Sequence, residues 1–199
     1  RKGKVFFVDI PGSAQSGVFV LQSGPPRNAK DYFPTSMMAA ILGGGFTSRI
    51  NMNLREDKGY TYGTYSRYQY MKKTSTMVAR GSVRSDSTYQ AIKEINQEII
   101  GMKNATKPAT PAELKREKNS SILGLPGRFS TASRALSMYS NLVYYGLPLD
   151  YYNSYVANVN QVTLEEVMKA AKKHLHPKKS KILIVGDANA KMTTRENGK

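Results

Sequence analysis

The sequence predicts an α+β domain in which helices cover one face of a mainly antiparallel sheet. Apolar residues alternate with a period of two in some segments and recur at helical spacing in others, and the two kinds of segment come in blocks. Hydrophobic residues make up 40% of the 199 residues, which is enough for a core. We expect one domain over residues 1–188 and a flexible tail over 189–199.

Five segments are predicted to be strands because they are rich in β-branched or aromatic residues and lie between turn-forming residues. The first two flank the Pro11-Gly12 turn and are expected to form a hairpin or strand pair. The third should pair with the fourth and carry several tyrosines, Tyr60 and Tyr62 among them, on one face. In chain order the predicted strands are 4–10, 14–24, 60–70, 74–83 and 180–187.

The predicted helices are recognised by their apolar spacing and by their end signals. Ser85 or Asp86 is expected to cap one helix, Pro111 to begin another, and Thr163 with Glu166 to form a capping box. Gly124, Pro126 and Gly127 should interrupt the long helical stretch 112–145, because proline removes a backbone donor and collides with the preceding turn. Two short helices are expected within 147–159 and 163–175.

The stretch around three consecutive glycines is the most unusual part of the sequence. A helix over 30–42 is expected to end at Gly43–Gly45, and Thr47 or Ser48 to cap the next helix. That second helix should bury a stripe of Phe46, Ile50 and Leu54 and end near Gly59. The glycines follow a helix rather than a strand and no Gly-Lys-Ser/Thr follows, so they fit a tight turn better than a phosphate-binding loop.

Several kinds of chemistry are poorly supported by the residues available. Absence of cysteine excludes disulfides, thiolate nucleophiles and cysteine-ligated zinc. His174 and His176 stand two apart, whereas metal-binding histidines on one helix face need a spacing of three or four, so we expect no metal site in this chain. Neither histidine has a distinctive partner in the sequence, and no Gly-x-Ser-x-Gly turn supports a serine triad.

The net charge of +16 favours acidic partners and makes nucleic acid an alternative to be weighed. Basic and aromatic residues interleave in residues 65–73, and lysines cluster in 169–181, a combination able to stack bases and neutralise phosphates. The sequence contains no recognised nucleic-acid-binding motif, however, and lysines on amphipathic helices usually form a solvated face. No apolar run approaches the roughly 20 residues that cross a bilayer, so no membrane partner is expected.

The segment LGGGFTSRINMNLREDKGYTYG, residues 42–63, resembles the C-terminal, non-catalytic half of pitrilysin/insulinase-like zinc peptidases, the inverzincins. The resemblance extends upstream over residues 8–45 and downstream over 144–187, and so covers nearly the whole chain. Its most diagnostic pieces are the Pro-Gly-x-x-Gln-Ser turn and Leu-Arg-Glu-x-x-Gly-x-x-Tyr. In such peptidases two homologous halves form a chamber, and the first half carries the zinc motif His-x-x-Glu-His.

That zinc motif is absent from this sequence. The resemblance therefore implies that zinc and the general base come from a catalytic partner half, fused or separate, and that this chain alone is inactive. It assigns substrate binding near the scissile bond to Arg55 and Tyr62, with Tyr60 as an adjacent candidate. A permanently charged guanidinium and a neutral phenol donor suit a peptide carbonyl that is gaining negative charge.

Other readings of the same residues stay open. Arg55 could instead stabilise the negative end of its helix while Tyr62 packs on the sheet. The strand over 14–24 could offer an edge along which an extended peptide adds. Because the same fold resembles core subunits of respiratory complexes, a scaffold without catalysis is the main alternative to a peptidase domain. Bacterial relatives are often exported, which points to the periplasm by resemblance only.

Overall fold

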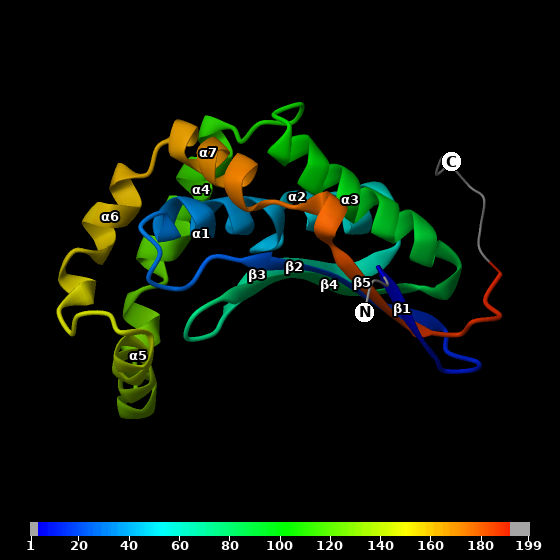
Figure 1. Cartoon of the computed structure of the whole chain (residues 1–199), viewed down its shortest axis with the longest axis horizontal. Helices are drawn as coiled ribbons and strands as arrows, with labels where there is room; N and C mark the ends of the chain where they lie inside the picture. The colour runs from blue at the N-terminus through cyan, green and yellow to red at the C-terminus, as the bar shows by residue number, and fades with distance from the viewer. Residues whose placement is uncertain (1–3, 192–199) are drawn as a thin grey trace.

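The computed structural model describes residues 4–191, in which helices lie on one face of a five-stranded sheet (Figure 1). The strand order is β1-β5-β2-β4-β3; β1 and β5 run parallel and every other neighbouring pair is antiparallel. This arrangement confirms the predicted α+β class. Of the expected tail, residues 192–199 lie outside the described residues. The strands are β1 Val5–Asp9, β2 Gln15–Gly24, β3 Thr61–Tyr70, β4 Ser75–Arg84 and β5 Lys181–Gly186.

The expected pairing of the first two strands is wrong, because the last strand lies between them. Val18 and Val20 of β2 stand opposite Ile184 and Ile182 of β5, and β5 is paired with β1 on its other side. Since β2 pairs with β4 on its other side, it has no free edge. The expectation that residues 14–24 offer an edge for a peptide is therefore also wrong.

The helices begin and end close to the predicted positions. The Thr163–Glu166 capping box is present at the start of α7, and a second box joins Thr110 to Glu113 at the start of α4. The interruption around Pro126 divides α4 from α5, as predicted. The α-helices are α1 Tyr32–Gly43, α2 Arg49–Asn51, α3 Thr88–Lys103, α4 Pro111–Leu123, α5 Ala132–Tyr145, α6 Tyr155–Gln161 and α7 Leu164–His174.

The core lies between the sheet and the helices that cover it. Alternate residues of β2, Val18 and Val20 among them, point toward the helices and are almost completely buried. Helix α1 packs against β3, α7 and α4, and α3 packs against β2 and α7. Burying this much aliphatic surface is the main stabilising term of such a layer. The largest fully buried side chains are Met37, Met38, Ile41, Leu42, Ile50, Leu54, Met77, Ile95, Ile99, Met102, Leu142 and Leu175.

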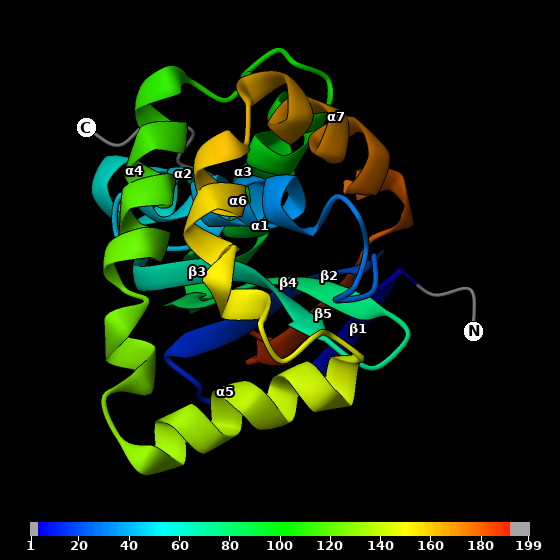
Figure 2. The ribbon, with the colours of Figure 1, turned by 90° about the vertical axis from the view of Figure 1, so that its left-hand side faces the viewer.

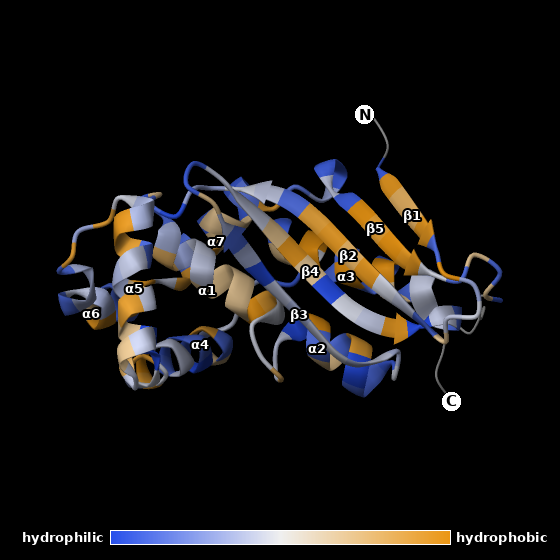
Figure 3. Ribbon diagram, turned by 90° about the horizontal axis from the view of Figure 1, so that it is seen from below, coloured by the Kyte–Doolittle hydropathy of each residue, from blue (hydrophilic) through white to orange (hydrophobic). Residues whose placement is uncertain are grey.

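The opposite face of the sheet carries no helix, and its part over β1, β5 and β2 is largely apolar (Figure 3). The pairing registers place its side chains in adjacent rows on β1, β5 and β2, and all of them are exposed or only partly buried. A continuous exposed apolar patch marks an interaction surface more often than a solvent boundary. We call it the open face; its residues are Phe6, Val8, Phe19, Leu21, Leu183 and Val185.

Helix α5 projects beyond the sheet, away from the other helices (Figures 1 and 2). Leu142 is its one buried residue, whereas four large apolar residues are exposed: Leu136, Tyr139, Val143 and Tyr144. The Tyr145 hydroxyl donates to the Tyr70 carbonyl oxygen at 3.1 Å and so ties the end of α5 to β3. Within residues 4–191, no helix combines the length and apolarity that crossing a bilayer requires.

Candidate functional site

The end of α1 is held against the sheet by a glycine. A Cβ on Gly43 would collide with the Ser66 amide nitrogen of β3, so this position needs a residue without a side chain. Neither Gly43 nor the C-capping Gly44 has a positive φ, and helix termination by a left-handed glycine is therefore not the reason for the cluster. Gly43 therefore permits close packing of α1 on β3, a role that the predicted tight turn did not include.

The segment after the glycines is irregular. Ser48 is the N-cap of α2, which has only three residues before a π-helical turn, Met52–Asp57, carries the chain on. The expected buried stripe is right for Ile50 and Leu54 but wrong for Phe46, which precedes the helix and is exposed. Single π-helical turns are rare and often occur at functional sites.

Side-chain amides fix this irregular segment to its neighbours. Asn51 accepts a hydrogen bond from the Thr64 amide of β3 at 2.9 Å and donates to the Phe46 carbonyl at 2.6 Å. Asn53 donates to the carboxylates of Glu94 and Glu98 on α3, both at 3.0 Å. The π-helical turn is therefore attached to both the sheet and a core helix, which restricts where Arg55 can point.

The connection from the π-helical turn to β3 has two further irregularities. Gly59 has a φ of 63°, a left-handed conformation that glycine adopts without steric cost. In the pairing of β3 with β4, Thr61 stands opposite Val83 and Thr64 opposite Gly81. Two residues of β3 therefore lie between these pairs where β4 has only one, which defines a β-bulge. Tyr62 lies in this bulge and is 85% exposed, whereas Tyr68 farther along β3 is buried, so the tyrosines of this strand do not all share one face as expected.

Arg55, Tyr60 and Tyr62 line one open pocket of about 580 Å³. The Arg55 side chain is 39% exposed; its guanidinium lies 4.6 Å from the centre of the Phe46 ring, and its Nε is 3.1 Å from the Glu56 carboxylate. Gln15 at the start of β2 and Arg84 at the end of β4 complete the rim. The geometry brings all three predicted residues to one solvent-open surface, and Tyr62 does not pack on the sheet.

Asn51, Asn53 and Arg84 are parts of this region that the sequence did not single out. Asn51 and Asn53 stand inside an apparent helix, where asparagine has low propensity, and that mismatch was the available signal. Arg84 ends a strand next to Asp86, and its guanidinium pairs with that carboxylate at 2.6 Å. This ion pair fixes one basic side of the pocket.

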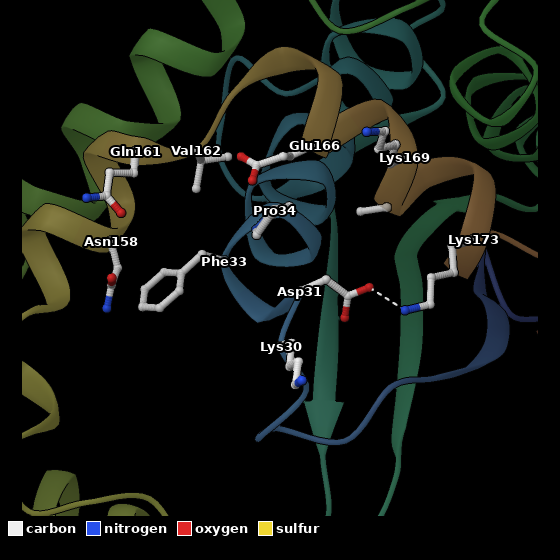
Figure 4. Close-up of a pocket in the computed structure, with 11 residues that line it drawn as sticks. Lys30, Asp31, Phe33, Pro34, Asn158, Gln161, Val162, Glu166, Lys169 and Lys173 are labelled. Atoms are coloured by element: carbon white, nitrogen blue, oxygen red, sulfur yellow. Dashed lines mark hydrogen bonds and ion pairs between the residues drawn. The ribbon is translucent and has the colours of Figure 1, made fainter.

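His174 belongs to a different cluster, where α7 ends beside the start of α1. His174 is buried, and its Nε2 lies 2.8 Å from an Asp31 carboxylate oxygen. The Lys173 ammonium lies 2.7 Å from the same oxygen (Figure 4). Burial alone would raise the pKa of Asp31, but hydrogen bonds from Lys173 and His174 lower it below its ordinary value. The expectation that neither histidine has a distinctive partner is wrong, since Asp31 lies 143 residues away in sequence.

The described part of the chain offers no group of side chains that suits zinc. Among residues 4–191, no three histidine, cysteine or carboxylate side chains lie close enough together to hold a metal ion. The Nε2 of His174 already contacts the Asp31 carboxylate, and burial, Lys103 and Lys179 lower the pKa of His176. No catalytic step through a metal is therefore derived for this chain.

The chain is similar to several proteins of known sequence. Residues 1–121 match the family described as the peptidase M16 inactive domain. A curated protein of Helicobacter pylori (strain ATCC 700392 / 26695), the non-peptidase homolog YmxG, is 28% identical over 150 residues. That alignment covers 73% of this chain and 33% of the relative, so the chain spans only about a third of the relative's length.

Solved structures show the same fold. A peptidase M16 inactive domain from Pseudomonas fluorescens superposes with a TM-score of 0.83 at 26% identity, covering 95% of this chain and 45% of that one. A protease from Helicobacter pylori gives 0.80 at 16% identity, covering 91% and 43%. Complex III2 from Candida albicans contains a chain that gives 0.75 at 11% identity, covering 92% and 46%. These three chains are more than twice as long as their matched parts.

The matched family confirms the resemblance that residues 42–63 carry. The segment from β1 to α3, which includes the whole Arg55–Tyr62 junction, lies within the match, and the fold agrees over nearly the full chain. The protein therefore belongs to the peptidase M16, or pitrilysin-like, family as one of its inactive domains.

Proposed function

We propose that this domain closes the proteolytic chamber of a zinc metallopeptidase and positions peptide substrate with Arg55 and Tyr62. The observation that carries the proposal is the shared pocket of about 580 Å³ lined by Arg55, Tyr60 and Tyr62. Zinc and the general base belong to a catalytic half with a His-x-x-Glu-His motif, which is another part of the same polypeptide or a separate subunit.

The two side chains supply complementary hydrogen-bond donors. Arg55 keeps its charge at every physiological pH and presents several donors in a fixed fork, while the Tyr62 phenol donates from a rigid arm. Both groups are solvent-accessible, and they are held by a π-helical turn and a β-bulge rather than by a long loop. Donors held in advance stabilise a developing oxyanion because little reorganisation is needed in the transition state.

Two apolar surfaces support a partner half. The open face and the exposed residues of α5 lie on the side of the molecule that the other helices leave free (Figures 2 and 3). The matched relatives are longer chains, so the additional part of each could cover such surfaces. A partner seated there would bury apolar area that is otherwise exposed to water.

The test is reconstitution with a catalytic half. The domain, fused or mixed with an M16 half that carries His-x-x-Glu-His, is assayed for peptide hydrolysis with the wild type, Arg55→Ala and Tyr62→Phe. Loss of one donor in an arranged site is expected to lower kcat/KM on the order of 10²- to 10³-fold. Arg128→Ala and Tyr89→Phe, exposed and outside the pocket, are the matched controls and should leave the rate unchanged.

Association must be measured separately from hydrolysis. Sedimentation or titration calorimetry with the same variants should give unchanged affinity for the catalytic half, since neither substitution touches the open face or α5. Wild-type rates in both Arg55→Ala and Tyr62→Phe, in a complex that forms and is active, would contradict the positioning role.

A scaffold without catalysis is the second candidate. It is supported by the non-peptidase homolog among the relatives and by the respiratory-complex chain among the structures of the same fold. In that case the domain would bind its partner through the open face, and Arg55 and Tyr62 could be replaced without effect on any function. A partner polypeptide that lacks His-x-x-Glu-His would favour the scaffold.

A further inference from the structure

The outermost strand of the sheet, β1, exposes apolar side chains on both of its faces. Val5, Phe6, Phe7 and Val8 are each between 39% and 56% exposed. Among the described residues β1 pairs with β5 alone, so one side of its backbone has no partner strand. A hydrophobic edge strand of this kind is a template for pairing with another chain, and isolated domains usually protect such edges.

The hydrogen bonds show which backbone groups of β1 are free. The Lys4 carbonyl accepts from the Ile182 amide at 2.7 Å, and the Ile10 amide donates to the Gly186 carbonyl at 2.8 Å. In a parallel pair, alternate residues bond to a given neighbour. The even-numbered residues of β1 therefore face β5, and the backbone groups of Val5, Phe7 and Asp9 point to the open edge.

A groove with a basic rim lies beside this edge, on the helix-covered side of the sheet. It has a volume of about 570 Å³ and lies between β1, β5, α3 and the short turn Pro177–Lys179. Its apolar floor is Val5, Ile100, Pro177 and Ile182, and its rim includes Lys4, Lys103, Lys178 and Lys179.

The charge around this groove has one sign. None of the residues that line it is an aspartate or glutamate. The Lys103 ammonium donates to the Lys172 and Leu175 carbonyls, at 3.0 and 2.5 Å, which fixes a positive charge on the α3 side. Burial and the neighbouring Lys103 and Lys179 lower the pKa of His176, as expected where positive charges gather. Anionic groups are therefore the complementary ligands.

We propose that the free edge of β1 binds an extended segment of an acidic partner polypeptide as a sixth strand. Its side chains alternate: apolar ones lie beside Phe6 and Val8 on the open face, and acidic ones lie over the basic groove near Lys4, Lys178 and Lys179. Main-chain hydrogen bonds to Val5 and Phe7 supply part of the affinity, and the alternation supplies specificity.

A second copy of this chain is a poorer occupant of the same edge. Pairing two β1 strands would bring two basic rims together, and each chain already carries a net charge of +16. The site is also separate from the Arg55–Tyr62 pocket, because β1 and β3 are opposite edges of the sheet. The inference therefore stands or falls independently of the proposed peptidase role.

The test uses designed octapeptides of alternating valine and glutamate, with valine–lysine peptides of the same length as the comparison. Binding to the protein is followed by fluorescence anisotropy at two salt concentrations. The acidic peptide should bind more weakly as salt increases, and the basic peptide should not bind. Methylating alternate amides along the pairing edge of the acidic peptide should abolish binding, whereas methylating the other edge should not.

Variants of the protein locate the contact. Lys178→Glu with Lys179→Glu should weaken binding at least 10-fold, while the matched change Lys72→Glu with Lys73→Glu, at the β3–β4 turn, should not. Phe7→Pro removes an outward amide, which an edge strand tolerates, and should weaken binding beyond Phe7→Ala. Equal binding of basic and acidic peptides, indifference to the methylated edge, or self-association through β1 would each overturn the proposal.

Discussion

The segment from α2 to β3 and the helix α7 are two short parts of the molecule that obey different rules. Helix α7 begins with the Thr163–Glu166 capping box and ends with basic residues, as helix chemistry favours. The α2–β3 segment has a three-residue helix, a π-helical turn, a left-handed glycine and a bulge within residues 49–64. Both are attached to the same α1.

The two segments differ in whether nearby or distant residues determine their backbone conformation. Helix α7 follows from its own residues, and its tertiary contacts only place it. The α2–β3 segment depends on residues far along the chain, among them Glu94, Glu98 and Glu113, which hold it in shape. Irregular backbone at a candidate binding site fits the general expectation that such sites depart from the rules of stable elements.

Removing a long-range contact of the α2–β3 segment should lower the free energy of unfolding more than any other change considered. Arg49 forms two hydrogen bonds of 2.6 Å with the Glu113 carboxylate and also donates to the carbonyls of Lys107 and Pro108. Arg49→Ala leaves the partly buried Glu113 carboxylate with only its Thr110 hydrogen bonds and removes its cationic partner, and should lower the free energy of unfolding by about 2–3 kcal/mol.

Urea denaturation at pH 7 measures this change. The matched control is Arg84→Ala, whose ion pair with Asp86 lies on a more exposed side chain and should cost less than about 1 kcal/mol. Equal losses in the two variants would mean that the irregular segment needs no support from α4.

The glycines before α2 offer a sharper, intermediate test. Gly43→Ala forces a Cβ against the Ser66 amide and should cost about 1–3 kcal/mol. Gly45 has open space around it and no positive φ, so Gly45→Ala should be neutral or stabilise by about 0.4–1 kcal/mol. Thermal unfolding of the two variants measures the difference in stability. A similar loss of stability at both positions would show that the α1–β3 contact is not the reason for glycine at position 43.

The smallest effect is expected in the pH dependence of the α7 end. Asp31 has a lowered pKa in the folded protein, so its ion pairs stabilise the fold above the ordinary aspartate pKa and are lost as pH falls through the folded value. The free energy of unfolding should therefore decrease from about pH 5 downward. In Asp31→Asn this decrease should be shallower, as acid titrations monitored by circular dichroism would show; an unchanged slope would place the acid sensitivity elsewhere.

Much of the fold was predictable because its signals are local. Runs rich in β-branched or aromatic residues between turn-forming residues predicted all five strands, and Pro111, Pro126 and the Thr163–Glu166 box predicted helix starts and a break. The pairing of β1 was not predictable in the same way, since its partner β5 lies about 180 residues away and no local rule identifies it. A turn as clear as Pro11-Gly12 predicts only that the chain changes direction.

The candidate site was predictable in its residues but not in its geometry. The family resemblance pointed to Arg55 and Tyr62 as substrate-binding candidates, and in the structure both line the same pocket. The sequence did not predict the bulge that exposes Tyr62 or the start of α2 that leaves Phe46 against Arg55. The His174–Asp31 contact was missed because burial of the histidine depends on how α7 packs on α1.

The bulge in β3 also ties the presentation of Tyr62 to the length of the chain. Three steps from Thr61 to Thr64 stand opposite two steps of β4, so one residue of β3 is in excess. Deleting Gly63 would leave two steps opposite two and would restore a regular ladder without changing the β4 partners of Thr61 and Thr64. The inserted residue is therefore dispensable for strand pairing, and its consequence is the bulged backbone that carries Tyr62.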